Sequence, residues 1–376
     1  MSSSRLKILI MHQGSIGDSL VVSPILEHLR KKFPDAHIAL YNRSAVGVFP
    51  CVGELFAPTG FVDEFMTGSL PKNRIFQMWE RLWLLLKLRK EGYDIAVNLH
   101  RNECRDPEKY LSRSRRFLRL AGVRRLYGFN TPIDYPFNEP ERRREGIDKI
   151  GVLLARRLRE EMLLDDRDFD RVADLRFTEE ECGAARQFWH EMGIPPGTVP
   201  VAVGIGGKKA VCRYPSEHYR MILEELVENN RVFPVFFGGE GDREEAAALC
   251  RQLNSGAVAP TALPLRKTIC LMRFCRMFIG NDTGTIHMAA HAHLRCVGLY
   301  AANSFRGLWY PLGRGHRILR GEAECEVCQR TDCDTFPARC IAAIPPEEVI
   351  RAAKEILASS NVNSPPAVIS TIENTV

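Results

Sequence analysis

The sequence predicts an α/β protein made of two parallel-sheet domains, and three observations carry this prediction. Short apolar runs rich in Val, Ile and Phe alternate with segments of helical periodicity, which is the pattern of parallel β-α-β units. The pattern starts again in the second half of the chain, after a stretch punctuated by Pro and Gly. A chain of 376 residues is also long enough for two domains that each bury a core.

In the first half of the chain, strands are followed by longer helical segments. We expect strands at Lys7–Met11, His37–Tyr41, Asp94–Leu99 and Arg125–Phe129. We expect helices near Asp18–Phe33, Ile75–Lys90 and Glu145–Leu163. Because a helix follows most strands, neighbouring strands are expected to run parallel.

The second half repeats this alternation. We expect strands at Pro200–Ile205, Val232–Phe237, Met277–Gly280 and Cys296–Tyr300. We expect helices near Ser216–Asn229, Asp242–Leu253, Leu265–Cys275 and Thr285–Ala292. A last amphipathic helix is expected from Pro346 to about Ala358, and the residues after it lack an apolar period, which is typical of disorder.

The join between the two domains is predicted in the stretch that separates these halves. An acidic segment from Asp165 to about Asp174 precedes a helix-like segment that ends in the Pro- and Gly-rich run Gly193–Gly197. We therefore expect an N-terminal domain over residues 1–172, a C-terminal domain over residues 173–345, and a helix with a disordered tail over residues 346–376.

Composition favours a cytoplasmic protein with reduced thiols. The densest apolar stretch, Trp79–Leu88, is shorter than a membrane span and is broken by Arg81 and Lys87. The N-terminus passes quickly into a strand-like segment and shows no apolar signal core. Twelve cysteines are too sparse in 376 residues for a disulfide framework.

The first motif that can carry chemistry is the turn Gln13-Gly14-Ser15-Ile16-Gly17-Asp18 after the first strand. In an open α/β sheet the carboxyl ends of the strands face the ligand, so Asp18 is a candidate general base and Gly14 and Gly17 can shape a binding turn. The alternative is that Asp18 is a helix N-cap. The turn lacks the full G-x-G-x-x-G pattern, which disfavours a nicotinamide cofactor.

The second motif, Gly280–His287, again joins a strand end to a helix start. Backbone N–H groups after Gly284, together with the helix dipole, would attract a diphosphate. The other polar side chains of the motif offer hydroxyl, carboxylate and imidazole groups to a nucleotide sugar: Asp282, Thr283, Thr285 and His287. Helix capping and a buried structural histidine are the alternatives.

The third motif, Gly204–Lys209, is a glycine-bearing loop with cations. Gly206 lets the backbone approach a ligand, and Lys208, Lys209 and Arg213 supply positive charge for a phosphate or a departing diphosphate. The spacing of a Walker loop is absent. An exposed basic loop without a ligand is the alternative.

The fourth motif, Phe237–Asp242, leads into an acidic first helical turn. Asp242 or Glu244 can accept hydrogen bonds from ribose hydroxyls at this strand end. The same carboxylates can instead simply complement the helix dipole.

A late cysteine cluster has the spacing Cys325-x2-Cys328-x4-Cys333-x6-Cys340. Four thiolates can hold a structural zinc ion, although this spacing is not a standard pair of C-x2-C knuckles. Free thiols and disulfides are the alternatives.

Positive charge is concentrated between Arg101 and Arg159, where fourteen Arg and two Lys stand against eight Asp or Glu. Arginine clusters suit phosphate and carboxylate ligands and also anionic membrane surfaces, while a solvated helix face explains part of the charge. Nucleic acid is disfavoured, because no binding module or row of stacking aromatics accompanies the charge. The D-x-D triplets between Asp166 and Asp170 lie away from strand-end turns and are discounted as a metal site.

Taken together, Ile16-Gly17-Asp18 after the first strand and the late run Gly280-Asn281-Asp282-Thr283-Gly284-x-x-His287-x-Ala289-Ala290 resemble glycosyltransferase family 9. The best-known members of that family are the lipopolysaccharide heptosyltransferases. The resemblance runs from about Lys7 to Ala353 and includes Arg124–Phe129 and the late cysteines.

The resemblance implies a GT-B fold of two Rossmann-like domains facing a central cleft, with acceptor on the N-terminal domain and nucleotide sugar on the C-terminal domain. It implies inverting transfer of heptose from ADP-heptose to a lipopolysaccharide core acceptor, without a metal or another cofactor. The basic first domain predicts an anionic acceptor, a lipid-linked saccharide, with peripheral contact to the inner face of the inner membrane. Implied roles are general base for Asp18, donor-phosphate binding for Arg213, and the donor loop for Asp282, Thr283, Gly284 and His287.

Two departures leave the donor sugar open. The family's Lys-x-Trp-Pro appears here as Cys212-Arg213-Tyr214-Pro215, and its Tyr-Gly-Pro-Thr as Tyr300-Ala301-Ala302-Asn303. A transferase for a different nucleotide sugar and a catalytically inactive nucleotide-sugar-binding scaffold are therefore the competing hypotheses. The presence of Asp18 argues against the inactive scaffold.

Overall fold

The computed structural model describes residues 5–43, 50–68, 73–101, 106–135 and 145–359. These residues form two compact units, each with one parallel sheet. The N-terminal unit contains residues 5–135 and 148–176, and the C-terminal unit contains residues 145–147 and 177–359. The chain thus passes between the units after Arg176, and the final helix belongs to the C-terminal unit, whereas the sequence predicts boundaries at residues 172 and 345.

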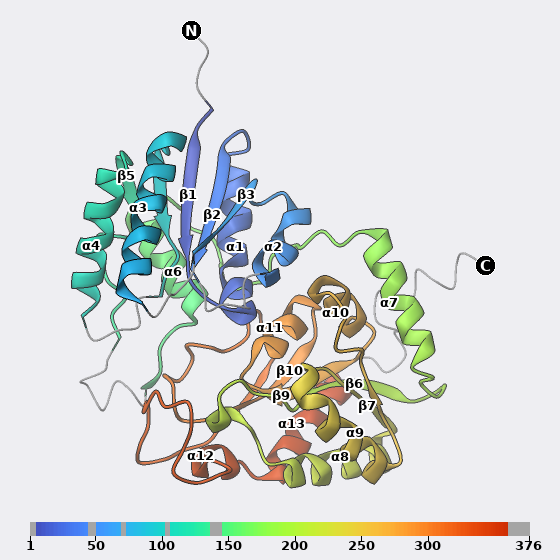
Figure 1. Cartoon of the computed structure of the whole chain (residues 1–376). Helices are drawn as coiled ribbons and strands as arrows, with labels where there is room; N and C mark the ends of the chain where they lie inside the picture. Colours follow the sequence, from blue (N-terminus) through green and yellow to red (C-terminus); the bar gives the residue numbers. More distant parts are fainter. Residues whose placement is uncertain (1–4, 44–49, 69–72, 102–105, 136–144, 360–376) are drawn as a thin grey trace. The chain divides into compact units, whose positions relative to one another are not determined.

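The N-terminal unit is built on a five-stranded sheet of order β3-β2-β1-β4-β5 (Figure 1). All four strand pairs are parallel. The strands are β1 (Lys7–His12), β2 (His37–Arg43), β3 (Glu64–Gly68), β4 (Ile95–Asn98) and β5 (Arg125–Tyr127). β1 lies between β2 and β4, and its residues Ile8, Leu9 and Ile10 are fully buried, as expected for a central parallel strand covered on both faces.

Helices cover both faces of this sheet. α1 contacts α2 and α6, and α3 contacts α4. The bounds are α1 (Ile16–Lys32), α2 (Pro50–Phe56), η1 (Ala57–Thr59), α3 (Arg74–Glu91), α4 (Pro107–Leu120) and α6 (Ile150–Glu160). Residues 146–149 are not helical and Gly146 has a positive φ of 92°, so α6 begins at Ile150, later than the predicted Glu145.

The C-terminal unit has a six-stranded sheet of order β11-β10-β9-β6-β7-β8, again parallel in every pair. The strands are β6 (Val199–Gly204), β7 (Val232–Phe236), β8 (Ala257–Val258), β9 (Met277–Asn281), β10 (Arg295–Tyr300) and β11 (Arg317–Arg320). β6 and β9 are adjacent central strands, so the residues that follow their carboxyl ends come close together.

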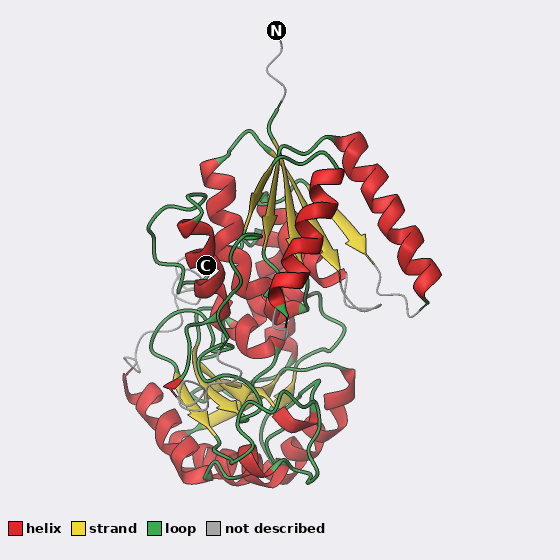
Figure 2. Cartoon of the chain, turned by 90° about the vertical axis from the view of Figure 1, so that its left-hand side faces the viewer, coloured by secondary structure: helices red, strands yellow, loops and turns green. Residues whose placement is uncertain are grey.

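Helices also cover the sheet of the C-terminal unit (Figure 2). α8 contacts α9 and α13, while α10 contacts α7 and α11. The bounds are α7 (Glu179–Glu191), η2 (Ala210–Cys212), α8 (Ser216–Asn230), η3 (Glu240–Asp242), α9 (Arg243–Leu253), α10 (Leu265–Met272), α11 (Gly284–His291), α12 (Arg339–Ala342) and α13 (Pro346–Ser359). Among the residues described in both units, no helix is long and apolar enough to span a membrane.

Candidate active site

The N-terminal candidate site lies where β1 ends and α1 begins. Asp18 stands three residues after the N-cap residue Ser15, so the alternative in which Asp18 is itself the N-cap is wrong. Its Oδ2 accepts hydrogen bonds from the Ser15 N–H at 2.8 Å and from the Ser15 hydroxyl at 2.9 Å. Its Oδ1 accepts a hydrogen bond from the Arg101 guanidinium at 3.0 Å. The carboxylate therefore stabilises the start of the helix and also forms an ion pair with Arg101, which follows β4 in the chain.

The pKa of Asp18 lies below its ordinary value. Burial raises this pKa, since only 16% of the side chain is exposed, but the Arg101 charge, the Ser15 hydrogen bonds and the nearby His12 outweigh burial. Desolvation lowers the pKa of buried His12 to about 4, so this imidazole is neutral at pH 7. Asp18 is consequently an ionised carboxylate at neutral pH that can accept a proton or a hydrogen bond.

Gly14 is required by the close approach of Asp18. A Cβ atom at position 14 would lie 2.1 Å from the Asp18 Cβ and 2.5 Å from its Cγ, so no side chain fits there unless Asp18 moves. Gly17, the other predicted glycine, is buried in the first turn of α1. The turn is therefore shaped around the carboxylate.

Two residues that sequence reasoning did not single out complete this site. His100 and Arg101 follow the carboxyl end of β4, the strand next to β1. His100 Nε2 lies 2.5 Å from the Gln13 side-chain oxygen, and its ring stacks on Tyr110 with 4.9 Å between ring centroids. The strand-end rule that found Asp18 applies equally to these residues, so that signal could have found them.

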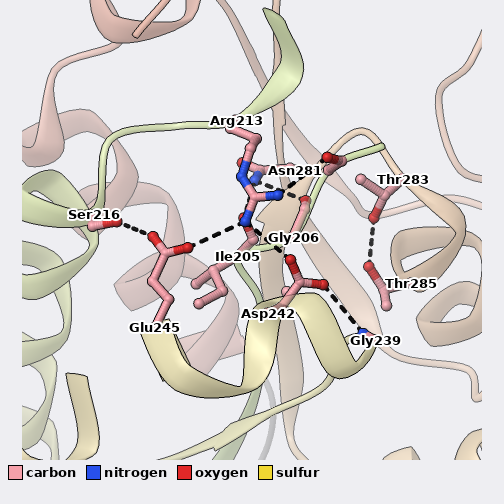
Figure 3. Close-up of polar contacts among 12 residues, drawn as sticks. Ile205, Gly206, Arg213, Ser216, Gly239, Asp242, Glu245, Asn281, Thr283 and Thr285 are labelled. Atoms are coloured by element: carbon pink, nitrogen blue, oxygen red, sulfur yellow. Dashed lines mark hydrogen bonds and ion pairs between the residues drawn. The ribbon is translucent and has the colours of Figure 1, made fainter. Parts of the chain in front are cut away.

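The C-terminal candidate site is an ion-pair cluster centred on Arg213. Arg213 Nη2 donates to Asp242 Oδ1 at 3.0 Å and to Glu245 Oε2 at 3.2 Å, and Nη1 donates to the Gly207 carbonyl at 3.3 Å. Figure 3 shows the guanidinium between the two carboxylates. The Ser216 hydroxyl holds Glu245 from the other side. The structure thus joins the predicted residues Arg213 and Asp242 and adds Glu245, which the sequence did not identify.

The loop after β6 passes tightly beside this cluster. A Cβ atom at Gly206 would lie 2.3 Å from Asp242 Oδ2, so glycine is needed for the approach. Asp242 also accepts a hydrogen bond from the Gly239 N–H at 3.1 Å. Next to Asp242 the surface has a shallow hollow, open to solvent, with a mainly apolar lining that includes Ile205 and Phe237.

Other predicted residues stand around the cluster without joining it. Lys208, Lys209 and Glu244 are exposed, so their side chains are available to solvent or to a ligand. The contacts described for Arg213, Asp242 and Glu245 do not include these three side chains.

Asn281, at the end of β9, ties the loop after β6 to the neighbouring strand. Its buried amide nitrogen donates to the carbonyls of Ile205 at 2.7 Å and Gly206 at 3.0 Å. Its oxygen accepts from the Tyr219 hydroxyl at 2.9 Å and from the Tyr214 N–H at 3.3 Å. All four hydrogen-bonding positions of the amide are therefore filled, and the residue fixes the backbone beside Arg213.

The predicted loop after Asn281 opens α11. The hydroxyls of Thr283 and Thr285 lie 2.6 Å apart, and Thr283 uses its hydroxyl in this way instead of capping the helix. Asp282 and Gly284 are half-buried, so the helix start is reachable. His287 is buried one turn later, and its carbonyl accepts a hydrogen bond from the His291 ring at 2.9 Å.

The four late cysteines lie in the C-terminal unit as free thiols. Cys340 is buried and desolvation raises its pKa, whereas backbone N–H groups near Thr335 lower the pKa of Cys333. Across the residues that the structure describes, no group of three or more His, Cys, Asp or Glu side chains is arranged to hold a metal ion. The zinc site at Cys325, Cys328, Cys333 and Cys340 stays a prediction.

Comparison with known proteins shows a family similarity in the C-terminal half of the chain. The model of glycosyltransferase family 9 (heptosyltransferase) matches residues 200–338, which include Arg213, Asp242 and the loop from Asn281 to His287. These C-terminal residues are similar to glycosyltransferase family 9. Asp18 lies outside the matched residues.

Curated relatives are similar to this chain over part of their length. The chain is 27% identical over 97 residues to lipooligosaccharide heptosyltransferase 2 of Campylobacter jejuni, covering 26% of this chain and 30% of the relative. It is 24% identical over 155 residues to lipopolysaccharide heptosyltransferase 2 of Salmonella typhimurium, covering 40% of this chain and 44% of the relative. The aligned segments thus span less than half the length of these relatives.

Solved structures match the fold over almost the whole chain. A glycosyltransferase of family 9 from Veillonella parvula has a TM-score of 0.70 and 20% identity, covering 96% of this chain and 99% of the other. An ADP-heptose lipopolysaccharide heptosyltransferase II from E. coli has a TM-score of 0.63 and 18% identity, covering 94% and 99%. The predicted fold class, two Rossmann-like parallel-sheet α/β domains of GT-B type, is confirmed.

The two clusters differ in what they can do chemically. The Asp18 cluster offers an ionised carboxylate on a rigid helix start, which suits proton abstraction from a hydroxyl group. The Arg213 cluster combines a guanidinium, carboxylates and an open helix N-terminus beside it, which suits phosphate and ribose groups.

Proposed function

We propose that this chain is an inverting glycosyltransferase that moves a sugar from a nucleotide diphosphate donor to a saccharide hydroxyl. The observation that carries the proposal is Asp18, an ionised carboxylate held at the carboxyl end of the central strand β1 by Ser15 and Arg101. A residue so placed suits a general base. The family 9 match over residues 200–338 and the heptosyltransferase relatives support the same class of reaction.

In this proposal the donor diphosphate binds beside Arg213 in the C-terminal unit. The guanidinium leaves part of its contact with Asp242 and Glu245 and donates to phosphate oxygens, in a geometry that arginine favours. The first N–H groups of α11, after Thr283, contribute the positive end of the helix dipole. Together these groups stabilise the charge that develops on the departing diphosphate.

In the same proposal, the nucleoside packs against the shallow hollow beside Asp242. Its lining by Ile205, Phe237 and Val258 suits the flat apolar faces of a nucleobase, while the Asp242 carboxylate can accept hydrogen bonds from ribose hydroxyls. An E. coli heptosyltransferase of similar fold has been solved with ADP, which supports an adenine nucleotide here. ADP-heptose is therefore the donor that we propose.

Transfer proceeds by one displacement. The acceptor hydroxyl oxygen attacks the anomeric carbon while its proton passes to Asp18. The new carbon–oxygen bond forms as the bond from the anomeric carbon to the diphosphate oxygen breaks, and the diphosphate leaves with the electron pair. A single attack from the opposite face inverts the anomeric configuration. Arg213 and the start of α11 meet the diphosphate charge, so the proposal assigns no step to a metal.

The acceptor in this proposal is an anionic lipid-linked saccharide of the lipopolysaccharide core. Exposed arginines on α4, among them Arg113, Arg116 and Arg119, give the N-terminal unit positive charge that attracts such a molecule. The name of the Salmonella relative, a lipopolysaccharide heptosyltransferase, supports this class of acceptor. An acceptor attached to lipid also implies peripheral contact with the inner face of the inner membrane.

The test is transfer in vitro. The purified chain is mixed with ADP-heptose and a heptose-free lipopolysaccharide core, and the product is detected by mass spectrometry with and without EDTA. We expect a mass increase of one heptose, unaffected by EDTA, with inverted anomeric configuration by NMR. Transfer from another nucleotide sugar would correct the donor, and EDTA-sensitive transfer would contradict metal independence.

Donor binding compared with transfer separates an inactive scaffold from a transferase. Thermal shift with ADP, ADP-heptose and other nucleotides reports binding, because a ligand of the folded state raises its apparent stability. Arg213→Leu should lose most of the ADP shift, while Arg220→Leu, on the same stretch of chain but paired with Glu217 and Glu224, should keep it. Binding without transfer to any core acceptor would favour the scaffold.

A further inference from the structure

Helix α3 carries a continuous row of exposed apolar side chains. Phe76 is 64% exposed, Trp79 is 61% exposed and Trp83 is 51% exposed. We define the α3 face by these three together with the other large exposed hydrophobic residues of the helix: Ile75, Met78, Leu82 and Leu86. Large apolar side chains gathered on one surface mark an interaction site, whereas single exposed ones are ordinary.

The α3 face is distinct from the side of the helix that holds it to the protein. Leu84 and Leu88 are buried and belong to the core of the N-terminal unit. At 100° per residue, the α3 face points away from these two leucines and covers nearly half of the helix circumference. Packing in the core therefore accounts for Leu84 and Leu88 but not for the aromatic side chains on the exposed side of the helix.

Positive charge borders the α3 face. Arg89 and Lys90 are exposed on the same helix, and at 100° per residue they project on the same side as the α3 face. α4, which contacts α3 at the outside of the N-terminal unit (Figure 1), adds exposed arginines along its length. Tryptophans flanked by arginine and lysine are typical of helices that lie in the headgroup region of anionic bilayers. The charge therefore favours an anionic lipid surface over a neutral apolar partner.

The position of α3 in the sheet connects this face to the candidate site. α3 follows β3 and precedes β4, and both strands run parallel to β1. A helix that crosses between parallel strands starts at the edge where the strands end, which is also the edge that carries Asp18. The aromatic first half of α3 therefore lies toward the same edge of the sheet as the proposed base.

We propose that the α3 face inserts into the headgroup region of an anionic bilayer and anchors the N-terminal unit there. The inference deepens the proposed function, since it names the surface that meets the membrane in which a lipid-linked acceptor sits. Trp79 and Trp83 enter the interface, and Arg89 and Lys90 contact lipid phosphates.

The test is binding of the full chain to vesicles without any acceptor saccharide. Co-sedimentation with phosphatidylglycerol vesicles is compared with phosphatidylcholine vesicles for wild type and for the double variant Trp79→Ser/Trp83→Ser. Met162→Ser is the matched control, because Met162 is 88% exposed in the same unit but lies outside the α3 face. A charge variant, Arg89→Gln/Lys90→Gln, tests the electrostatic part.

Wild type and the Met162 variant should bind anionic vesicles, and the tryptophan variant should bind about tenfold or more weakly, since affinity scales with the apolar area inserted. The charge variant should lose the preference for phosphatidylglycerol. Unchanged vesicle binding in the tryptophan variant would overturn the proposal. So would a wild-type dimer in sedimentation velocity that the same variant converts to monomer, because the face would then bind a second copy.

The experiments distinguish failure of the membrane-binding proposal from failure of the proposed transferase function. Vesicle binding needs no donor or transfer, and transfer to a delipidated core oligosaccharide needs no vesicle. The tryptophan variant should therefore retain transfer to the delipidated acceptor at the wild-type rate while losing the vesicle interaction.

Discussion

Lowering the pH should destabilise the N-terminal unit through His12, and His12→Gln should remove that part of the effect. His12 is buried at the end of β1, with its Nε2 3.3 Å from the Ser19 hydroxyl. Burial lowers its pKa from 6.5 to about 4 in the folded protein. The unfolded chain therefore takes up a proton first as the pH falls below 6.5, and stability is lost from there down to about pH 4.

The magnitude follows from the two pKa values of His12. One pKa unit corresponds to about 1.4 kcal/mol, so the imidazole removes about 2 kcal/mol of stability between pH 7 and pH 5. Asp18 contributes little in this window, because its pKa lies below its ordinary value of 3.8 and its effect appears only at more acid pH. Desolvation also lowers the pKa of His28 in the same unit, so comparison with the His12 variant isolates one residue.

The assay is urea denaturation at a series of pH values, read by the fluorescence of Trp79 and Trp83. Trp189 and Trp309, the two tryptophans of the C-terminal unit, are replaced by Phe so that the signal reports the N-terminal unit alone. Wild type should lose about 2 kcal/mol more than His12→Gln between pH 7 and pH 5. Equal losses in the two proteins, or an NMR titration of His12 near pH 6.5, would refute the reasoning.

Three further changes test the clusters. Gly206→Ala would place a Cβ atom 2.3 Å from the flexible end of the Asp242 side chain. The affinity for ADP, measured by calorimetry, should therefore fall about tenfold, with little change in melting temperature. Unchanged affinity would contradict the assigned donor site. Arg101→Gln removes the charge that lowers the pKa of Asp18. The acid limb of the pH profile of kcat/KM should therefore move to higher pH. If the acid limb does not move, Asp18 is not the group that titrates there. Asn281→Ala leaves several buried hydrogen-bonding partners unsatisfied, so the free energy of unfolding in urea should fall by about 3 kcal/mol. A loss below about 1 kcal/mol would show that water replaces the amide.

The central part of each sheet could be predicted because its strands are buried on both faces. β1 and β6 read as continuous apolar runs, which the sequence displays directly. The edge strands β3, β8 and β11 escaped prediction for physical reasons. β8 has only two residues, and β11 begins and ends with arginine, so neither shows an apolar run. Their pairing with a neighbouring strand, which no local pattern records, defines them.

Helix α4 shows that many charged residues can hide the buried face of a helix in the sequence. Its segment, Pro107–Leu120, was noted for its arginines, yet Leu111 and Leu118 are buried at helical spacing and fix it against the sheet. The apolar positions were too few among the charges to stand out. In α3 the apolar residues are numerous and predict the helix. They do not show which side of the helix packs against the protein and which side is exposed.

The candidate sites were partly predictable because parallel strands carry functional residues at their carboxyl ends. Residue type and strand-end position found Asp18, Arg213 and Asp242. The partners Arg101 and Glu245 come from other parts of the chain, and only the fold brings them within hydrogen-bonding distance. A sequence shows which groups are available but not which of them neutralise one another.

The most direct test of the account compares transfer and binding in Asp18→Asn. The variant keeps the shape of the side chain and removes its charge, so the donor site around Arg213 stays intact. We predict that transfer from ADP-heptose falls by a factor of about 10² to 10⁴, the range of a lost general base, while the affinity for ADP stays at its wild-type value. Transfer at the wild-type rate by Asp18→Asn would contradict the assignment of Asp18 as the base.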